Sequence, residues 1–159
     1  MILFLDFDGV THPEPHAPEA AFTQLPLIES VVRERVHVAI VVSSSWRESR
    51  SLDELRDFFA PDIQPRVVGV TPDLWDQALA PAYVRELECL AWLAANRPVG
   101  TRWLAIDARP LAQVMPRLAG DDANPDETEQ LVIALRRANV INGPTAVALL
   151  GRYFDETRK

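Results

Sequence analysis

Two aspartates, Asp6 and Asp8, stand one residue apart directly after the apolar run 2–5. Carboxylates this close repel each other, and a fold keeps such a pair mainly where a cation or a shared proton compensates them. Neither histidine nor cysteine is clustered at the pair, so a hard, oxygen-seeking ion such as Mg²⁺ fits. Gly9 permits a sharp turn immediately afterwards. The first residues therefore predict a carboxylate site for magnesium.

Hydroxyl groups follow a second apolar run, in the sequence Ser43-Ser44-Ser45-Trp46-Arg47. If a helix begins there, its free N–H groups would add a site for an anion. Taken alone, such a serine cluster is explained at least as well by simple helix capping. Its interest comes from its place in the chain after Asp6.

The positive charge for any anion site must come from arginine, because the only lysine is the final residue, Lys159, and chain ends are usually mobile. Arg85 stands in a segment with helical spacing, and Asp107 follows a further apolar run, 103–106. These patterns alone do not select one arginine or one further acid for the site.

The run Asp6-Phe7-Asp8-Gly9-Val10 after an apolar strand resembles motif I of the haloacid dehalogenase-like (HAD) hydrolases. Ser43, Arg85 and Asp107 then follow in the order of the family's motifs II, III and IV, so the resemblance covers most of the chain. It implies a HAD-like, Rossmann-type fold and a Mg²⁺-dependent phosphatase that works through an aspartyl-phosphate.

The resemblance also implies a role for each residue. Asp6 would be the nucleophile, and Asp8 the general acid and base that protonates the leaving oxygen and then activates water. Ser43, with Ser44 as second choice, would hydrogen-bond the transferred phosphoryl group. Arg85 would bind phosphate where the family normally has a lysine, with a planar fork instead of a compact ammonium.

The implied metal site departs from the family's usual pattern. Family members usually show two acids at motif IV, whereas Ala108 follows Asp107 here. Asp6, the Asp8 carbonyl and Asp107 would still hold magnesium, because that ion readily keeps several waters. Two acids of the polar, turn-rich segment 120–126 could assist: Asp121 and Asp122.

The apolar runs that carry these residues are continuous rather than alternating, which favours strands buried on both faces of a parallel sheet. Strands are predicted at 2–5, 36–42, 67–70, 103–106 and, less clearly, 131–135, although 129–138 could equally be helical. Helical spacing lies between them, at Leu25, Ile28, Val31 and Val32, at Leu52, Leu55, Phe58 and Phe59, and at Leu87, Leu90 and Leu93. The alternation predicts one α/β domain over residues 1–159, a three-layer α/β/α sandwich around a mainly parallel sheet.

Two serines fit the capping box, in which a serine and a glutamate three residues later satisfy the first turn of a helix. They are Ser45 with Glu48 and Ser51 with Glu54. A short helix or turn followed by a longer helix is therefore predicted over 46–60.

The amino-acid composition limits which ligands and partners the protein is expected to bind. A net charge of -7 argues against a protein whose whole surface grips nucleic acid, although a local basic groove stays open. The single cysteine, Cys89, excludes an internal disulfide and a thiolate cluster for zinc. The first residues lack the basic flank and length of a secretory signal, and no apolar run could span a bilayer, so a cytoplasmic protein without a membrane partner is expected.

The intervals between the motifs leave no room for a large folded cap, which predicts an open site for a phosphorylated substrate: a nucleotide, a nucleic-acid end or a phosphoprotein. The serine-rich run before Trp46 and Arg47, the segment 69–72 and the helix at Trp92 and Leu93 are most similar to a capless subgroup associated with nucleic-acid repair proteins. The alternative is a catalytically weak or inactive HAD-like binding or scaffold module, in which Arg85 and Ala108 erode the chemistry. A phosphoacceptor receiver domain ranks low, because it needs a lysine on a late strand.

Four further residues near the motifs could touch substrate. His12 and His16 follow the first acidic loop, but loop histidines are more often bystanders. Trp46 and Arg47 could stack on a base or clamp a second phosphate. The plainer interpretation, with Trp46 packed beside the core and Arg47 solvated, is preferred.

Overall fold

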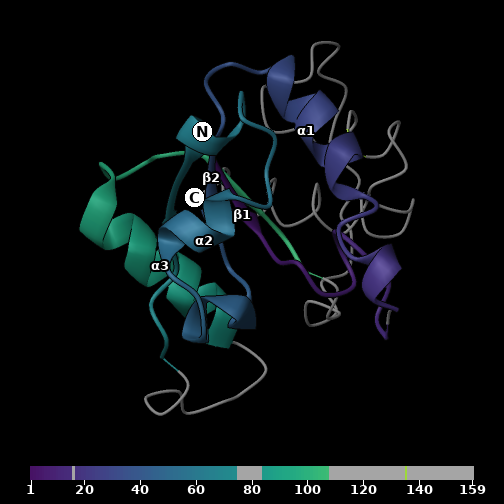
Figure 1. The fold of residues 1–159 in the computed structure, drawn as a ribbon. Helices are drawn as coiled ribbons and strands as arrows, with labels where there is room; N and C mark the ends of the chain where they lie inside the picture. The colour runs from purple at the N-terminus through teal and green to yellow at the C-terminus, as the bar shows by residue number, and fades with distance from the viewer. Residues whose placement is uncertain (16, 75–83, 108–134, 136–159) are drawn as a thin grey trace, which may run out of the picture.

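The computed structural model describes residues 1–15, 17–74, 84–107 and 135, and its centre is a four-stranded parallel sheet (Figure 1). The strands are β1 (Ile2–Leu5), β2 (Ala39–Val42), β3 (Val67–Val70) and β4 (Trp103–Ile106), in the order β3-β2-β1-β4. The first four predicted strands are confirmed. β2 begins three residues later than predicted, because Val36 lies in the preceding turn and is 84% exposed.

Helices connect the strands as the alternation predicts. α1 (Leu25–Arg33) joins β1 to β2, α2 (Leu52–Arg56) joins β2 to β3, and α3 (Val84–Asn96) precedes β4. Three short 3-10 helices complete the described elements, at η1 (Pro18–Ala20), η2 (Ser45–Glu48) and η3 (Gln64–Arg66). No helix in these described ranges has the length and apolarity needed to cross a membrane.

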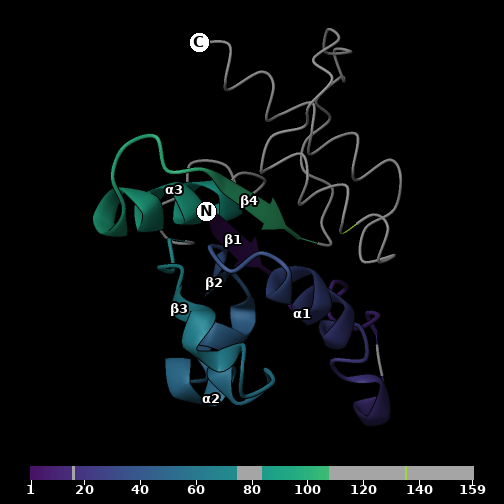
Figure 2. The same cartoon turned by 90° about the horizontal axis from the view of Figure 1, so that it is seen from above.

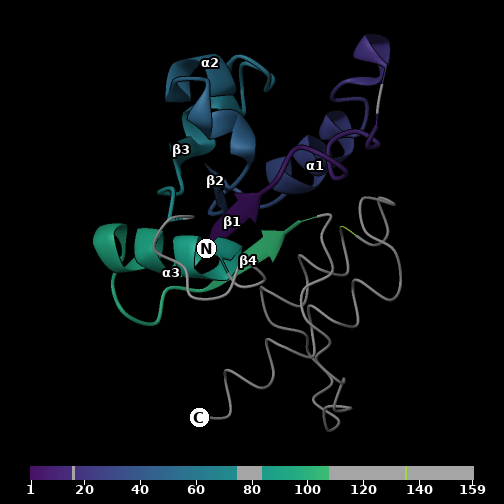
Figure 3. The same cartoon turned by 90° about the horizontal axis from the view of Figure 1, so that it is seen from below.

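Different helices cover the two faces of the sheet (Figures 2 and 3). Leu3 and Leu5 pack in one core cluster with residues of α1 and α2, whereas Ile2 and Phe4 pack in a second cluster with Cys89 and Trp92 of α3. Alternate residues of a strand point to opposite faces, so one apolar run can serve both clusters. The predicted three-layer α/β/α sandwich is confirmed.

α3 is helical as predicted, but Leu87 and Leu90 are each 44% exposed. The buried residues of this helix are Val84, Glu88, Cys89 and Trp92. Trp92 determines this orientation, because its ring lies edge-on to Phe4 at 5.8 Å. Gly69 of β3 leaves the space for the indole, since a Cβ there would come within 3.0 Å of Trp92 Nε1.

Only one of the two predicted capping boxes forms. Ser51 Oγ accepts a bond from the N–H of Glu54 at 3.3 Å, and the N–H of Ser51 donates to Glu54 Oε2 at 2.7 Å. The prediction of a capping box at Ser45 is wrong. The extended residue before η2 is Ser44, and a capping serine must occupy that extended position, so Ser45 lies one residue too late. α2 ends at Arg56, so the predicted longer helix is short.

Leu135 is helical and packs in the same cluster as Leu3 and Leu5, which at this residue favours the helical alternative over a strand. The rest of the segment 129–138 lies outside the described residues. So do His16, Ala108 and the two acids Asp121 and Asp122.

Candidate active site

The sheet register aligns the residues that follow three strands. Leu5, the last residue of β1, pairs with Val42 of β2 and with Ile106 of β4. The ladder continues one step further, because the N–H of Asp6 donates to Ile106 O at 3.0 Å and the N–H of Ser43 donates to Leu5 O at 2.8 Å. The structure thus brings three predicted site residues together at the carboxyl edge: Asp6, Ser43 and Asp107.

Strand alternation gives these three residues a common face. Each follows by two positions a residue of the cluster that α3 covers, namely Phe4, Val41 and Ala105. Side chains two residues apart in a strand share a face. The row of site residues therefore faces the first turn of α3, where Arg85 lies.

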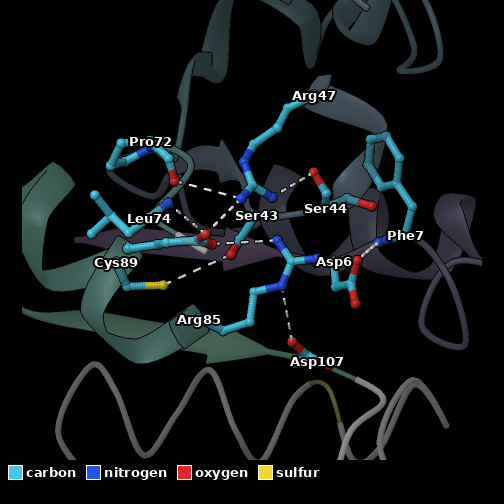
Figure 4. Close-up of polar contacts among 11 residues, drawn as sticks. Asp6, Phe7, Ser43, Ser44, Arg47, Pro72, Leu74, Arg85, Cys89 and Asp107 are labelled. Atoms are coloured by element: carbon cyan, nitrogen blue, oxygen red, sulfur yellow. Dashed lines mark hydrogen bonds and ion pairs between the residues drawn. The ribbon is translucent and has the colours of Figure 1, made fainter. Parts of the chain in front are cut away.

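Arg85 reaches from α3 to the acidic end of the row (Figure 4). Its Nε lies 4.0 Å from Asp107 Oδ2, and its Nη1 donates to Glu88 Oε2 at 3.4 Å. The side chain is 16% exposed. A guanidinium held between two acids places a positive charge beside Asp107.

The surroundings of Asp6 disfavour its ionised carboxylate. The residue is 4% exposed, and the N–H of Phe7 donates to its Oδ1 at 2.8 Å. Burial, followed by the charge of Asp107, raises the pKa of Asp6 to about 6, against the opposing effects of the Ser44 hydroxyl, the Phe7 N–H and Arg85. A buried carboxylate whose pKa is raised by burial and by a neighbouring acid is the electrostatic setting that a bound cation relieves.

A magnesium ion fits this setting in part. Asp6 and Asp107 offer two carboxylates, and the described residues gather no group of three acidic, histidine or cysteine side chains around a metal position. Mg²⁺ is commonly bound through one or two carboxylates and keeps several waters, so two acids meet its requirements. The hydroxyl of the buried Ser44 lies close enough to Asp6 to lower the pKa of that carboxyl, so it belongs to the same polar cluster.

Asp8 belongs to a different set of contacts from Asp6. Its Oδ1 lies 3.0 Å from Nε2 of His12, and the indole Nε1 of Trp46 is 3.1 Å from each carboxylate oxygen. The side chain is 28% exposed, whereas His12 is fully buried. Asp8 is thus oriented by two neighbours and is still open to solvent, a suitable state for proton exchange with a leaving group.

Aromatic rings fix Trp46 in turn. Three phenylalanine rings meet its indole edge to face, with centroids 5.2 to 5.8 Å away: Phe7, Phe22 and Phe58. Phe22 adopts a left-handed backbone with φ 59°, which is unfavourable for a bulky residue, and its ring stacks on Phe58 at 4.4 Å. We call the four rings of Phe7, Phe22, Trp46 and Phe58 the aromatic cage.

Ser43 and Ser44 occupy different environments. Ser43 Oγ lies 3.9 Å from Cys89 Sγ and borders a cavity of about 20 Å³ that Arg85 and Asp107 also line. Such a volume is enough for one water. Burial raises the pKa of Cys89 to about 12, so its thiol stays protonated and unreactive. Ser44 is the residue before η2, and its carbonyl accepts a bond from Arg47.

Arg47 is not solvated, contrary to the preferred prediction. Its side chain is 5% exposed and its Nη2 donates to Glu88 Oε1 at 2.8 Å. Burial lowers the pKa of Arg47, with the charge of Glu88 opposing the shift. Glu88 also accepts from the N–H of Leu74, so it ties η2, α3 and the segment after β3 together.

Glu88 was missed from sequence, whereas His12 and Trp46 were considered only as possible substrate contacts and their contacts with Asp8 were not predicted. The burial of Glu88 could have been predicted from its spacing. It falls four residues after Val84 and four before Trp92, on the face of α3 that is buried. Trp46 carried no such signal, because its contact with Asp8 spans 38 residues, whereas the contact of His12 is local, four residues after Asp8.

A larger surface hollow, of about 480 Å³, lies away from this site. It is lined by the end of α3 and the segment 97–103, including Arg97 and Trp103. These residues precede β4 or begin it, so they lie at the amino edge of the sheet. None of the predicted site residues borders the hollow.

A comparison with models of protein families identifies the family of the chain. A family model described as a HAD domain in Swiss Army Knife RNA repair proteins matches residues 2–137, a span that includes Asp6, Ser43, Arg85 and Asp107. No curated protein and no solved structure matches the chain.

Proposed function

Because the chain belongs to the family of HAD domains found in Swiss Army Knife RNA repair proteins, we propose that it is a magnesium-dependent phosphatase that removes a terminal phosphate from a nucleic-acid end. One observation carries the proposal. The register aligns Asp6, Ser43 and Asp107 beneath Arg85, while Asp8 is held apart by His12 and Trp46. A nucleophile and a separately oriented acid are what two-step phosphoryl transfer requires.

In the first step, a carboxylate oxygen of Asp6 attacks phosphorus as the bond from phosphorus to the leaving oxygen breaks. The N–H of Phe7 orients the attacking carboxylate. Protonated Asp8 gives its proton to the leaving oxygen, so the alcohol departs neutral. The product is an aspartyl-phosphate on Asp6.

In the second step, water attacks phosphorus while Asp8, now a carboxylate, removes a proton from it. The bond between Asp6 and phosphorus breaks, inorganic phosphate forms, and both aspartates return to their initial states. The contacts from His12 and Trp46 support this double role, because Asp8 must keep one orientation through two proton transfers.

The phosphoryl charge is balanced by Arg85 and by hydrogen bonds from the serines at the end of β2. Ser43 borders the same cavity as Arg85, and the hydroxyl of Ser44 acts on Asp6, so both are near enough to the nucleophile to serve the phosphoryl oxygens. When bound at Asp6, Asp107 and the Asp8 carbonyl, magnesium would supply the positive charge that offsets two carboxylates and a phosphate.

The test is phosphate release from 3′- and 5′-phosphorylated oligonucleotides, nucleotides and para-nitrophenyl phosphate, with Mg²⁺ and with EDTA. Asp6→Asn should abolish release, and Asp53→Asn, at an acid whose side chain is 88% exposed, is the matched control. Release that survives EDTA or Asp6→Asn contradicts the mechanism. No release from any substrate would instead favour the non-catalytic binding module.

A further inference from the structure

We propose that Arg50, lying over the face of Trp46, is a stacking subsite for the terminal nucleobase of a single-stranded nucleic-acid substrate. The proposal rests on the proposed function and adds the group that the enzyme would recognise beyond the phosphate. The Arg50 guanidinium carbon lies 4.3 Å from the centroid of the Trp46 ring and 5.9 Å from that of Phe58.

A contact with Asp8 places the Trp46 ring of this pair beside the proposed acid. The indole N–H of Trp46 contacts both oxygens of Asp8, so the ring lies beside the acid that must face the leaving group. In a phosphorylated nucleic-acid end, the leaving group is the sugar of the terminal nucleotide. A base attached to that sugar is thereby brought to the surface that Trp46 and Arg50 form.

In the Trp46–Arg50 pair, the tryptophan is fixed by packing and the arginine is exposed to solvent. The three phenylalanine rings of the aromatic cage contact Trp46, which leaves the indole little freedom to turn. Arg50 covers the face of the indole and is itself exposed. An arginine plane supported by a ring beneath it offers its outer face to a base at a low entropic cost, because the platform is already ordered.

The chemistry of the pair selects a nucleic acid. A guanidinium plane stacks on any base. The subsite tolerates different bases, because every base has a face to stack.

The experiment compares oligonucleotides whose phosphorylated terminal residue carries a base with otherwise identical ones whose terminal residue is abasic. Arg50→Ala should lower kcat/KM for the base-bearing ends by about tenfold, within the range for loss of one stacked base. It should leave the abasic ends and para-nitrophenyl phosphate unchanged. Equal losses on all substrates, or no loss on any, would overturn the proposal.

Two further variants separate stacking from charge and from fold. Arg50→Lys keeps the charge without the plane and should remain as impaired as Arg50→Ala. Full recovery in the lysine variant would replace stacking with simple attraction and reject the subsite. Arg97→Ala is the matched control. The guanidinium carbon of Arg97 lies 5.3 Å from the centroid of the Trp92 ring, in the same kind of contact, but at the C-terminal end of α3 and away from Arg85.

A binding measurement distinguishes failure of this subsite from failure of the phosphatase proposal. Fluorescence anisotropy of the Asp6→Asn protein with labelled ends needs no turnover. Base-bearing ends should bind about tenfold tighter than abasic ends, and Arg50→Ala should remove the difference. Equal affinities would reject the subsite even if phosphate release is found, and a difference would support it even if none is found.

Discussion

The guanidinium of Arg47 lies 2.8 Å from the carboxylate of Glu88, and both side chains are at least 95% buried. Glu88 also accepts a bond from Arg85, the cation beside Asp107. One buried acid therefore balances two arginines, one of them in the site. Removing it leaves charges that have lost their partner in a region of low dielectric.

We expect Glu88→Gln to lower the free energy of unfolding by about 3 to 5 kcal/mol, the usual effect of breaking a buried ion pair from one side. Urea unfolding followed by circular dichroism measures it. Glu34→Gln, at a side chain that is 76% exposed, should change stability by less than about 1 kcal/mol. The double variant Arg47→Met with Glu88→Leu should be more stable than Glu88→Gln, and the opposite order would contradict the buried-pair account.

Asp6→Asn should stabilise the metal-free protein at pH 7.5. The pKa of Asp6 is raised from 3.8 to about 6, so the folded protein holds this proton more tightly than the unfolded chain. Stability contributed by the proton is present below pH 3.8 and is lost as the pH rises to about 6. The shift corresponds to about 3 kcal/mol at most.

Urea unfolding in EDTA between pH 4 and pH 8 tests this expectation. The gap between Asp6→Asn and wild type should widen as the pH rises to about 6 and then stay constant, and millimolar Mg²⁺ should narrow it by stabilising the wild type. An Asp6→Asn protein that is less stable than wild type at pH 7.5 would show that Asp6 is not under electrostatic strain. Asp53→Asn should show no such profile.

Arg85 should be needed for turnover rather than for folding. Arg85→Ala removes a charge-assisted contact to the phosphoryl group, and losing one such donor typically lowers kcat by about 100-fold to 1,000-fold. Arg85→Lys should retain more activity than Arg85→Ala, because it keeps the charge that the family usually supplies through lysine. Steady-state phosphate release with matched thermal melts checks this, and equal activities of the two variants would count against an electrostatic role.

His12 should act as a positioning residue for Asp8. His12→Ala removes the contact at 3.0 Å and should lower kcat by about tenfold with little change in KM, because substrate binding is unaffected while proton transfer loses its geometry. His12→Gln places an amide nitrogen near the same point and should recover part of kcat. A change confined to KM, or no recovery with glutamine, would assign His12 to packing alone.

The sheet and the order of the site residues could be predicted because both are local properties. Each strand is an apolar run of four residues, and Asp6, Ser43 and Asp107 each come directly after one. A parallel sheet then collects its strand ends at one edge without any further information. The chain order of the motifs was therefore enough to assemble the row.

The rest depended on contacts across the fold. Trp46 approaches Asp8 from 38 residues away, and nothing in either segment specifies the partner. Arg47 was expected in solvent because arginine usually is, and only the burial of Glu88 opposite it reverses that preference. The Ser45 capping box failed for a finer reason, since one residue decides which serine is the extended one before the turn.

The alternation that turns Asp6, Ser43 and Asp107 toward α3 has a consequence for how this protein tolerates genetic change. Substitutions within the strands alter packing but leave the direction of the following residue intact. A deletion of one residue in β4 would place Ala108 in the position of Asp107 and would send the carboxylate to the opposite face. Divergence in this sheet should therefore proceed through replacements and loop-length changes, and hardly at all through single-residue insertions or deletions inside strands.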